Sequence, residues 1–453
     1  MASEKSNNAA ALSSRPAPGL RRAIGFDTAA ALVVANTIGS GIFTTSGFVA
    51  RDIGSPAWLL GLWIAGGLIE LIGALAYSEL SAAMPEAGGE YVYLREAYGP
   101  LAGYLSGWTS FFIGFSGAIA AATLAFVGYL HHFVSFVGPS ESPGGKGLAI
   151  VILILLTTIH VVGLRLGGGM QKVLTGGTIA GMAVLIVAGL SSGHGNLANF
   201  HSTIPAHGSA AVSLIFIVFA YSGWNAAAYV AGEVKEPQRT LPRALLAGMG
   251  VVIALYLGMN LFYLYALPVG AMSGVLAVAQ KASVSLFGAV AAHWITALLA
   301  LAILSSASAM VVAGPRVYYA MARDGVFPAL IGLVSPRYGT PARAMILQSA
   351  WSVVLILFFG TFEKVVIYTE FAVVIFSGLA VASVIVLRLR QPNLVRPFRC
   401  PGYPWLPVLY VCAMAWIATY TLLSRPQEAV VSLLVVGFGL PWYYLAQGRA
   451  KRA

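Results

Sequence analysis

Two long apolar segments of the chain are interrupted by glycine and polar residues. The first contains the run ANTIGSGIFTTSG, with Gly39 and Gly41, and the second contains FAYSGWNAAAYVAG, with Gly223. Where a helix is broken, one half presents free amide N–H groups and the other presents free carbonyl groups, each at a partly charged end of a helix dipole. This pair of opposite partial charges suits the carboxylate and ammonium groups of a small zwitterion such as an α-amino acid.

The two breaks together define a predicted binding site. Its predicted contact residues are Ile38, Gly39, Ser40, Gly41, Ile42, Phe219, Ala220 and Ser222. We expect the amides of Ser40, Gly41 and Ile42, with the Ser40 hydroxyl, to bind the carboxylate. Carbonyl groups near Ile38 and at the second break would accept hydrogen bonds from the ammonium group, and the missing glycine Cβ atoms permit close approach. The alternative interpretation is that these small residues let helices pack closely.

The composition places both breaks in a membrane protein. Of the 453 residues, 58% are hydrophobic and 9% are charged, whereas soluble proteins contain about 25% charged residues. Apolar stretches of roughly 20 residues, the length of a membrane-spanning helix, recur along the chain. We predict an all-α protein whose twelve spans cover residues 27–48, 58–83, 101–135, 148–164, 173–193, 210–231, 244–267, 289–320, 344–360, 365–387, 405–424 and 428–446.

The charged residues indicate how these spans are oriented. The net charge is +11, and only five of the 26 Lys and Arg residues fall on one side of the predicted membrane, namely Arg51, Lys146, Lys281, Lys364 and Arg425. Positive charge gathers on the cytoplasmic side of membrane proteins. We therefore expect a multi-pass protein of the plasma (inner) membrane with both termini in the cytoplasm. The same asymmetry explains the basic balance without a nucleic-acid partner.

The breaks fall in the first and sixth spans, which suggests two related halves. Five spans per half would give the halves opposite orientations, as residues 27–193 and 210–390, followed by two extra helices at 405–446. Residues 1–26 and 448–453 would be cytoplasmic tails of a single membrane domain covering 27–447. Paired glycine interruptions at corresponding positions of two halves are typical of a transporter site near the bilayer midplane.

Four ordered motifs carry a resemblance that extends over nearly the whole chain. They are NTIGSGIFTTSG, GALAYSELSAAMPEAGGEYVYLREAYGPLAGYLSGW, FAYSGWNAAAYVAGEVKEPQRTLPRAL and GPRVYYAMARDGVFP. These motifs resemble amino-acid permeases of the amino acid–polyamine–organocation (APC) superfamily, and most closely the L-type exchanger branch. The resemblance implies the leucine-transporter-like fold with 5+5 inverted repeats, and transport by alternating access.

The resemblance also implies roles for individual residues. Phe219 would form an aromatic lid over the substrate, and Asn225 would brace the second break, whereas Trp224 more often has a packing role. Charged residues in the segments after the second and sixth spans resemble parts of a cytoplasmic gate: Glu86, Glu90, Arg95, Glu233, Lys235 and Arg239. The alternative for these six residues is a solvated loop without gating ion pairs.

The coupling ion is less well specified by the sequence. Sodium-independent relatives carry a lysine in the fifth span, where this chain has Thr178. Hydroxyl groups of Ser305, Ser306 and Ser308 could bind sodium near Thr178, although serine side chains within a helix often bond to their own backbone. Glu70, in the middle of a span, is either a proton carrier or a neutral hydrogen-bonded side chain. We predict no cofactor besides a coupling Na⁺ or H⁺, and the scattered histidines predict no metal site.

These observations predict secondary active transport of neutral L-amino acids, by exchange or by proton- or sodium-coupled symport. Cationic amino acids or polyamines are the alternative substrates, and they are mildly disfavoured because the sequence places no acidic residue at the break to bind a second ammonium group. A membrane enzyme would need clustered histidines or carboxylates at one face of the bilayer, and this sequence shows no such cluster. A non-transporting sensor would usually add a long soluble tail, and both predicted tails are short. The expected partners are the amino acid and the lipid bilayer, and an accessory subunit is left open.

Overall fold

The computed structural model describes residues 22–132, 137–162, 168–333, 335 and 340–450. Within these ranges the chain is helical, and its only extended pairing is a single bridge between Ile24 and Val234. Among the described residues, ten helices are long and apolar enough to cross a membrane, and two shorter apolar helices, Thr175–Ser191 and Ala210–Tyr221, accompany them. These twelve correspond to the predicted spans, so the all-α membrane fold is confirmed. Most of the predicted N-terminal tail lies outside the described residues.

The first half of the chain contains the first broken helix and a bent third span. Its elements are α2 (Phe26–Thr37), α3 (Ser40–Ile53), α4 (Pro56–Ala83), α5 (Glu90–Tyr98), α6 (Pro100–Thr109), the π-helical turn η1 (Ser110–Phe115), α7 (Ser116–Leu130), α8 (Pro143–Val161) and α9 (Gly168–Ser191). The prediction of a loop between the second and third spans was wrong, because Glu90–Tyr98 forms a helix. The turn before α5 is made by Gly88 and Gly89, which have φ angles of 125° and 54°.

The second half repeats this pattern and is followed by two further helices. Its elements are η2 (Leu197–His201), α10 (Ala210–Tyr221), α11 (Ala226–Tyr229), η3 (Ala231–Glu233), α12 (Pro237–Ala266), α13 (Val269–Met272), α14 (Val278–Ala313), α15 (Pro315–Arg323), α16 (Ala342–Phe359), α17 (Phe362–Arg390), α18 (Trp405–Ser424) and α19 (Pro426–Ala450). The eighth span begins earlier than predicted, and Gly288 kinks it with a φ of 77°. Pro315 then begins α15, at the first helical position, where a missing amide hydrogen costs least.

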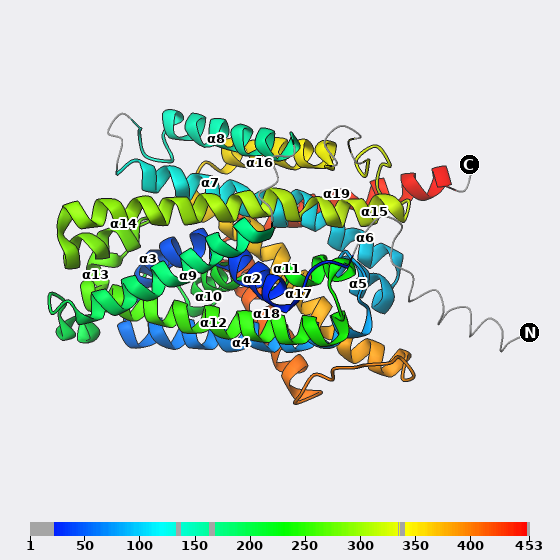
Figure 1. Cartoon of the computed structure of the whole chain (residues 1–453), viewed down its shortest axis with the longest axis horizontal. Coiled ribbons are helices and arrows are strands. Elements are labelled where there is room, and N and C mark those ends of the chain that lie inside the picture. Colours follow the sequence, from blue (N-terminus) through cyan, green and yellow to red (C-terminus); the bar gives the residue numbers. More distant parts are fainter. Residues whose placement is uncertain (1–21, 133–136, 163–167, 334, 336–339, 451–453) are drawn as a thin grey trace, which may run out of the picture.

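The two broken helices pack against each other crosswise. The second half of the first, α3, packs along the first half of the other, α10, while α2 contacts α11, and α12 packs against both α2 and α4. This pairing agrees with two halves of opposite orientation, while the repeat boundaries at 27–193 and 210–390 stay predictions. The long helices run side by side along the longest axis of the molecule, with α5 at one end and α13 at the other (Figure 1). We call these the α5 end and the α13 end.

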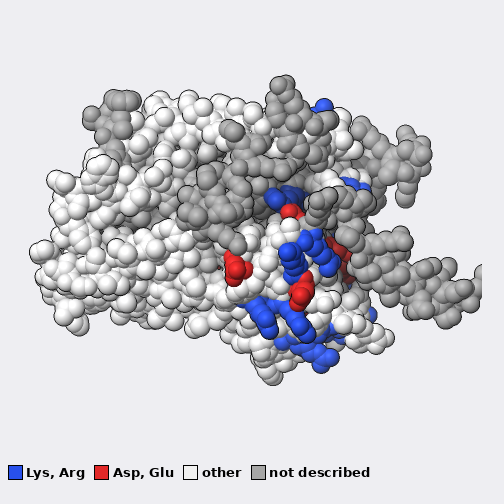
Figure 2. All heavy atoms as spheres, in the orientation of Figure 1, with Lys and Arg blue, Asp and Glu red and all other residues white. Residues whose placement is uncertain are grey.

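Charged side chains are distributed unevenly between the two ends. On the face shown in Figure 2, Lys and Arg gather toward the α5 end, while the α13 end is almost free of charged residues among the atoms described there. Large apolar side chains such as Leu298, Leu357 and Phe438 are exposed along the flanks of the bundle. An apolar flank with charge at one end is the pattern expected of a protein embedded in a bilayer.

Candidate substrate site at two helix breaks

The first break leaves the beginning of α3 without a cap. Helix α2 ends at Thr37, the backbone is extended at Ile38 with ψ of 95°, and α3 begins at Ser40 after Gly39. No side chain caps this helix start, and the first amides of a helix have no partner within the helix. The predicted break is therefore confirmed, and the amides of Ser40, Gly41 and Ile42 occupy the uncapped first turn.

The second break depends on a glycine that no other residue could replace without strain. Helix α10 ends at Tyr221, and the chain is unwound until α11 begins at Ala226. Gly223 has a φ of 96°, and a Cβ atom built on it would lie 2.5 Å from the carbonyl oxygen of Asn36. Ser222 turns back on the end of α10, since its hydroxyl donates to the Phe219 carbonyl at 2.9 Å. This second break is also confirmed.

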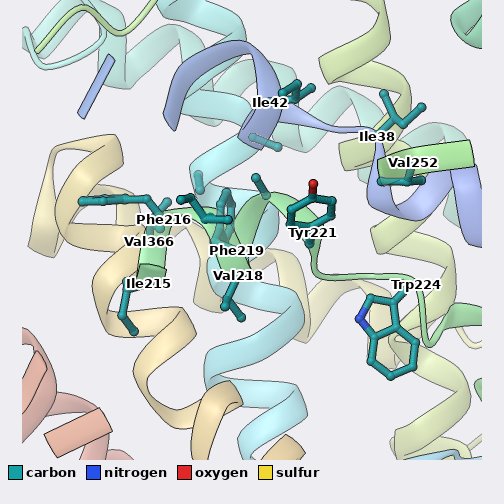
Figure 3. Packing of buried hydrophobic residues seen from close by; sticks show 14 of the residues in the cluster. Ile38, Ile42, Ile215, Phe216, Val218, Phe219, Tyr221, Trp224, Val252 and Val366 are labelled. Carbon is teal, nitrogen blue, oxygen red and sulfur yellow. The ribbon is translucent and has the colours of Figure 1, made fainter. Parts of the chain in front are cut away.

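The structure brings the predicted residues of both breaks together. A Cβ atom on Gly41 would lie 2.4 Å from the Cα atom of Ala220, and one on Gly39 would lie 2.6 Å from the Ser306 hydroxyl oxygen. Figure 3 shows Ile38 on the extended link between α2 and α3, beside Val252, with Tyr221 between Ile38 and Phe219 in this view. Close helix packing, the alternative interpretation of these glycines, therefore holds alongside the helix breaks. Binding by these residues stays a prediction.

Tyr256 on α12 connects the two breaks and was missed by the sequence analysis. Its hydroxyl oxygen lies 2.7 Å from the Thr37 carbonyl and 2.9 Å from the Ala220 carbonyl. A hydroxyl has a single proton, so it fully satisfies only one of these acceptors at a time. The side chain is 0% exposed. Because Tyr256 lies inside an unbroken apolar span, no local sequence signal pointed to it.

A cavity of about 90 Å³ opens beside the second break. Its lining comprises Asn36, Glu90, Ser106, Thr109, Ser110, Gly114, Phe115, Ala118, Phe219, Ser222, Gly223, Asn225, Ala226, Tyr229, Met310, Thr369, Glu370, Val373 and Phe376. Three residues predicted for the site, Phe219, Ser222 and Asn225, are therefore part of its wall. The first turn of α3 is buried beyond this lining.

Glu90 lines this cavity instead of forming a gating ion pair. The residue is 7% exposed, and its Oε1 atom accepts hydrogen bonds from the Tyr77 hydroxyl at 2.6 Å and from Asn225 Nδ2 at 2.8 Å. The turn at Gly88 and Gly89 directs the start of α5 into the bundle, which explains why the gate prediction was wrong for this residue. Burial raises the pKa of Glu90, and the two hydrogen bonds act in the opposite direction. Asn225 braces the second break against α5 through this contact.

A second carboxyl group in the cavity wall was overlooked in the sequence. Glu370, in the middle of α17, is 1% exposed and lines the cavity. The expectation that no acidic residue lies at the break was therefore wrong. The rule that singled out Glu70, that an ionisable residue within a span is a functional candidate, applies equally to Glu370 and would have found it.

Glu70 lies outside the cavity lining. It is 3% exposed, and its Oε2 atom accepts a hydrogen bond from Trp224 Nε1 at 2.7 Å. Trp224 thus has the packing role expected for it, and Figure 3 shows its ring below the unwound stretch, away from Phe219. Both interpretations of Glu70, a proton carrier or a neutral hydrogen-bonded side chain, stay open.

Comparison with known sequences identifies the protein family. The family described as amino acid permease matches residues 24–444. The chain belongs to the amino acid permease family. Among its relatives, the large neutral amino acids transporter small subunit 2 of Mus musculus is 30% identical over 455 residues, covering 98% of this chain and 84% of the relative. The serine/threonine exchanger SteT of Bacillus subtilis (strain 168) is 30% identical, covering 96% of this chain and 98% of the relative.

A third relative is the Asc-type amino acid transporter 1 of Mus musculus, which is 28% identical and aligns with 94% of this chain and 81% of its own length. The family and these relatives are transporters and not enzymes. The chain is accordingly an amino acid permease. The predicted membership of the APC superfamily and the predicted transport of amino acids are confirmed.

A smaller cavity of about 10 Å³ lies on the other side of the first break of the permease. Its lining comprises Val34, Ala35, Ile38, Thr175, Thr178, Ala302, Ser305 and Ser306. Thr178 and Ser305 are thus brought together as predicted, at a size that suits one water molecule or one small ion. Ser308 does not join them, because its hydroxyl oxygen lies 2.7 Å from His160 Nε2. Ser306, which was predicted together with Ser305 and Ser308, also lines the cavity.

The charged residues at the α5 end form ion pairs both within and beyond the predicted set. Arg95 pairs with Glu86, another predicted residue, at 3.5 Å, and also with Asp324, while Glu233 pairs with Arg316 at 3.1 Å. Lys235 and Arg239 are exposed, and in the part of the chain that the structure describes neither forms an ion pair. Arg316 in α15 and Asp324 directly after it were missed as partners, because nothing in the sequence places that segment beside α5 and η3.

Two further ion-pair clusters involve more deeply placed carboxylates. At the α5 end, Glu79 binds Arg388 at 2.6 Å and Arg396 at 3.4 Å. At the α13 end, Glu363 binds Arg51 and Arg425, each at 2.9 Å. Each cluster joins an element from the first half of the chain, α3 or α4, to α17 or a later segment.

Proposed function

We propose that the permease carries neutral L-amino acids across the plasma (inner) membrane by alternating access. The observation that carries the proposal is the pair of helix breaks, at Ile38–Gly39 and at Ser222–Asn225, packed crosswise beside a cavity. The uncapped first turn of α3 offers amide donors to a carboxylate, and the carbonyl groups at the end of α10 offer acceptors to an ammonium group. The names of the relatives, which include neutral amino acids, serine and threonine, support this substrate class.

Alternating access requires each end of the bundle to open in turn. In our proposal the cluster of Arg51, Glu363 and Arg425 closes the α13 end, and the pairs Arg95–Asp324 and Glu233–Arg316 close the α5 end. Partly exposed ion pairs are each worth only about 0–1 kcal/mol. The free energy needed to separate them is therefore small enough for the pairs to open during each transport cycle.

The α5 end would face the cytoplasm, with both termini on that side. This orientation is supported by the basic residues gathered at the α5 end (Figure 2) and by the small number of Lys and Arg residues assigned to the opposite side of the membrane. Cysteine introduced at exposed Glu141, in the loop before α8, would be labelled by an impermeant thiol reagent from outside intact cells if the orientation is right.

The test of the proposed function is uptake by purified permease in liposomes. Labelled L-leucine, L-alanine and L-serine should enter only liposomes that contain the protein. Uptake that accelerates when unlabelled amino acid is present inside identifies an exchanger, whereas accumulation that needs a proton or sodium gradient identifies a symporter. Absence of uptake for all amino acids under every gradient would contradict the proposal.

Sodium coupling forms a separate part of the proposal. The hydroxyl groups of Thr178, Ser305 and Ser306 around the small cavity are ligands of the kind that sodium prefers. Uptake that rises with sodium concentration would support this site, and a flat response would remove it. The mammalian relative is named as a small subunit, and co-purification of the permease from its native membrane would show whether it has a second subunit.

A further inference from the structure

Glu370 is a buried acid that forms no ion pair with any of the described residues. It lies near the middle of α17 and is 1% exposed, and its Oε1 atom has no hydrogen-bond partner among the described residues. An ionised carboxylate within a membrane-spanning helix is costly unless it is paired or faces a polar cavity. Glu370 has no pairing within the described residues, and it lines the cavity beside the second break.

The other groups around this cavity are rich in oxygen atoms. Glu90 faces it from α5, and its Oε1 atom accepts hydrogen bonds from the Tyr77 hydroxyl and from Asn225 Nδ2. No Lys, Arg or His is among the described residues of the lining. Hydroxyl groups of Ser106, Thr109 and other lining residues add further oxygen acceptors. The cavity therefore presents two carboxyl groups and several hydroxyl oxygens to whatever enters it.

The cavity borders the second break, which supplies part of the proposed site for the α-amino and α-carboxyl groups. Phe219, Ser222 and Asn225 belong both to the second break and to the cavity wall, whereas Glu370 lies on α17, on a different element. A volume of about 90 Å³ exceeds the roughly 10–15 Å³ that one water molecule needs. There is thus room for a charged group together with part of the alkyl chain that carries it.

We propose that this cavity is a cation subsite that receives the side-chain ammonium group of a basic amino acid, with Glu370 as its direct partner. The proposal rests on the proposed function, because the two breaks must hold the α-carboxylate and α-ammonium groups of the same molecule. Since the site has amide donors for a carboxylate, the favoured substrates are diamino acids such as lysine and ornithine and not diamines that lack a carboxylate. The permease then takes basic amino acids in addition to neutral ones.

The test compares labelled L-lysine with labelled L-leucine in liposomes that contain wild-type permease, the Glu370→Gln variant or the Glu141→Gln variant. Glu141 is an exposed acid in a loop before α8 and serves as the matched control for loss of one carboxylate. A hydrogen bond to a charged group corresponds to roughly a tenfold to hundredfold change in affinity. We expect Glu370→Gln to lower the ratio of lysine to leucine uptake by about that factor, and Glu141→Gln to leave the ratio as in the wild type.

Each other outcome has a defined meaning. The cation subsite would be overturned if wild-type permease transports leucine, does not transport lysine or ornithine, and is not inhibited by either. The proposed function would then still stand. The cation subsite would also be overturned if Glu370→Gln lowers lysine and leucine uptake in the same proportion. That result would indicate a structural or proton-carrying role for Glu370. Putrescine competing as well as ornithine would overturn the requirement for a carboxylate. Failure of all amino acid uptake would count against the proposed function itself.

A second variant keeps the test decisive if Glu370→Gln does not fold. Glu370→Asp retains the charge on a side chain that is one methylene shorter, and size-exclusion chromatography shows whether each variant is intact. We expect Glu370→Asp to keep inhibition of leucine uptake by lysine, with a weaker apparent affinity than in the wild type. Unchanged inhibition by lysine in a folded Glu370→Ala variant would contradict the proposal.

Discussion

Gly41→Ala adds one methyl group at the closest approach of the two broken helices. The new Cβ atom would lie 2.4 Å from the Cα atom and 2.7 Å from the Cβ atom of Ala220, whereas carbon atoms in contact are separated by about 3.5–4.0 Å. Helices α3 and α10 must therefore move apart by about 1 Å. Overpacking of this kind costs about 1–3 kcal/mol, which corresponds to a loss of about five- to 150-fold in the population of the correctly assembled site.

The assay is uptake of labelled L-leucine by liposomes, with Gly250→Ala as the matched control. Gly250 lies in α12, and a Cβ atom there would meet no other atom within 4 Å. We expect Gly41→Ala to lower leucine uptake by at least about fivefold and to reduce thermal stability modestly, while Gly250→Ala behaves as the wild type. Undiminished leucine uptake by Gly41→Ala would refute the reasoning, because the close contact of α3 with α10 would then have no bearing on transport.

Three further predictions concern the residues around the breaks. Tyr256→Phe removes the hydroxyl between the carbonyls of Thr37 and Ala220. We expect a loss of about 1–2 kcal/mol in the free energy of unfolding and a weaker affinity for leucine. An unchanged melting temperature would argue against this role of the Tyr256 hydroxyl. Glu90→Ala removes the acceptor shared by the buried Tyr77 hydroxyl and the half-buried Asn225 amide, and thermal unfolding should show a loss of about 1–3 kcal/mol, in contrast to exposed Glu141→Ala. Ser306→Ala should abolish any sodium dependence of uptake without changing the uptake measured in the absence of sodium, and retained sodium dependence would exclude this hydroxyl.

The sequence identified those features of the site that depend on local backbone chemistry. Glycines placed inside apolar spans predicted both helix breaks, since runs of glycine and polar residues occur at corresponding positions of the first and sixth spans, and Gly223 does adopt a positive φ of 96°. The span pattern likewise predicted the twelve apolar helices, because length and hydrophobicity are local properties. The family motifs agreed with the family later found by comparison.

The features that the sequence analysis missed depend on which helices become neighbours. Glu90 was expected in a gate, but α5 turns it toward Tyr77 and Asn225, residues 13 and 135 positions away in the chain. Arg95 pairs with Asp324, 229 positions away, and Tyr256 joins two breaks from a third helix. Ser308 was assigned to the small cavity, but its helical phase directs it to His160. Such contacts follow from tertiary packing, which has no signature within one segment.

The central claim is that two broken helices hold the backbone groups of an amino acid, and competition for leucine uptake tests it most directly. The measurement compares inhibition of labelled L-leucine uptake by L-leucine, by leucinamide, which lacks the carboxylate, and by 4-methylpentanoate, which lacks the ammonium group. Our account predicts strong inhibition by L-leucine and almost none by the two derivatives. Equal inhibition by all three compounds would contradict it, because the site would then recognise the side chain without the zwitterion.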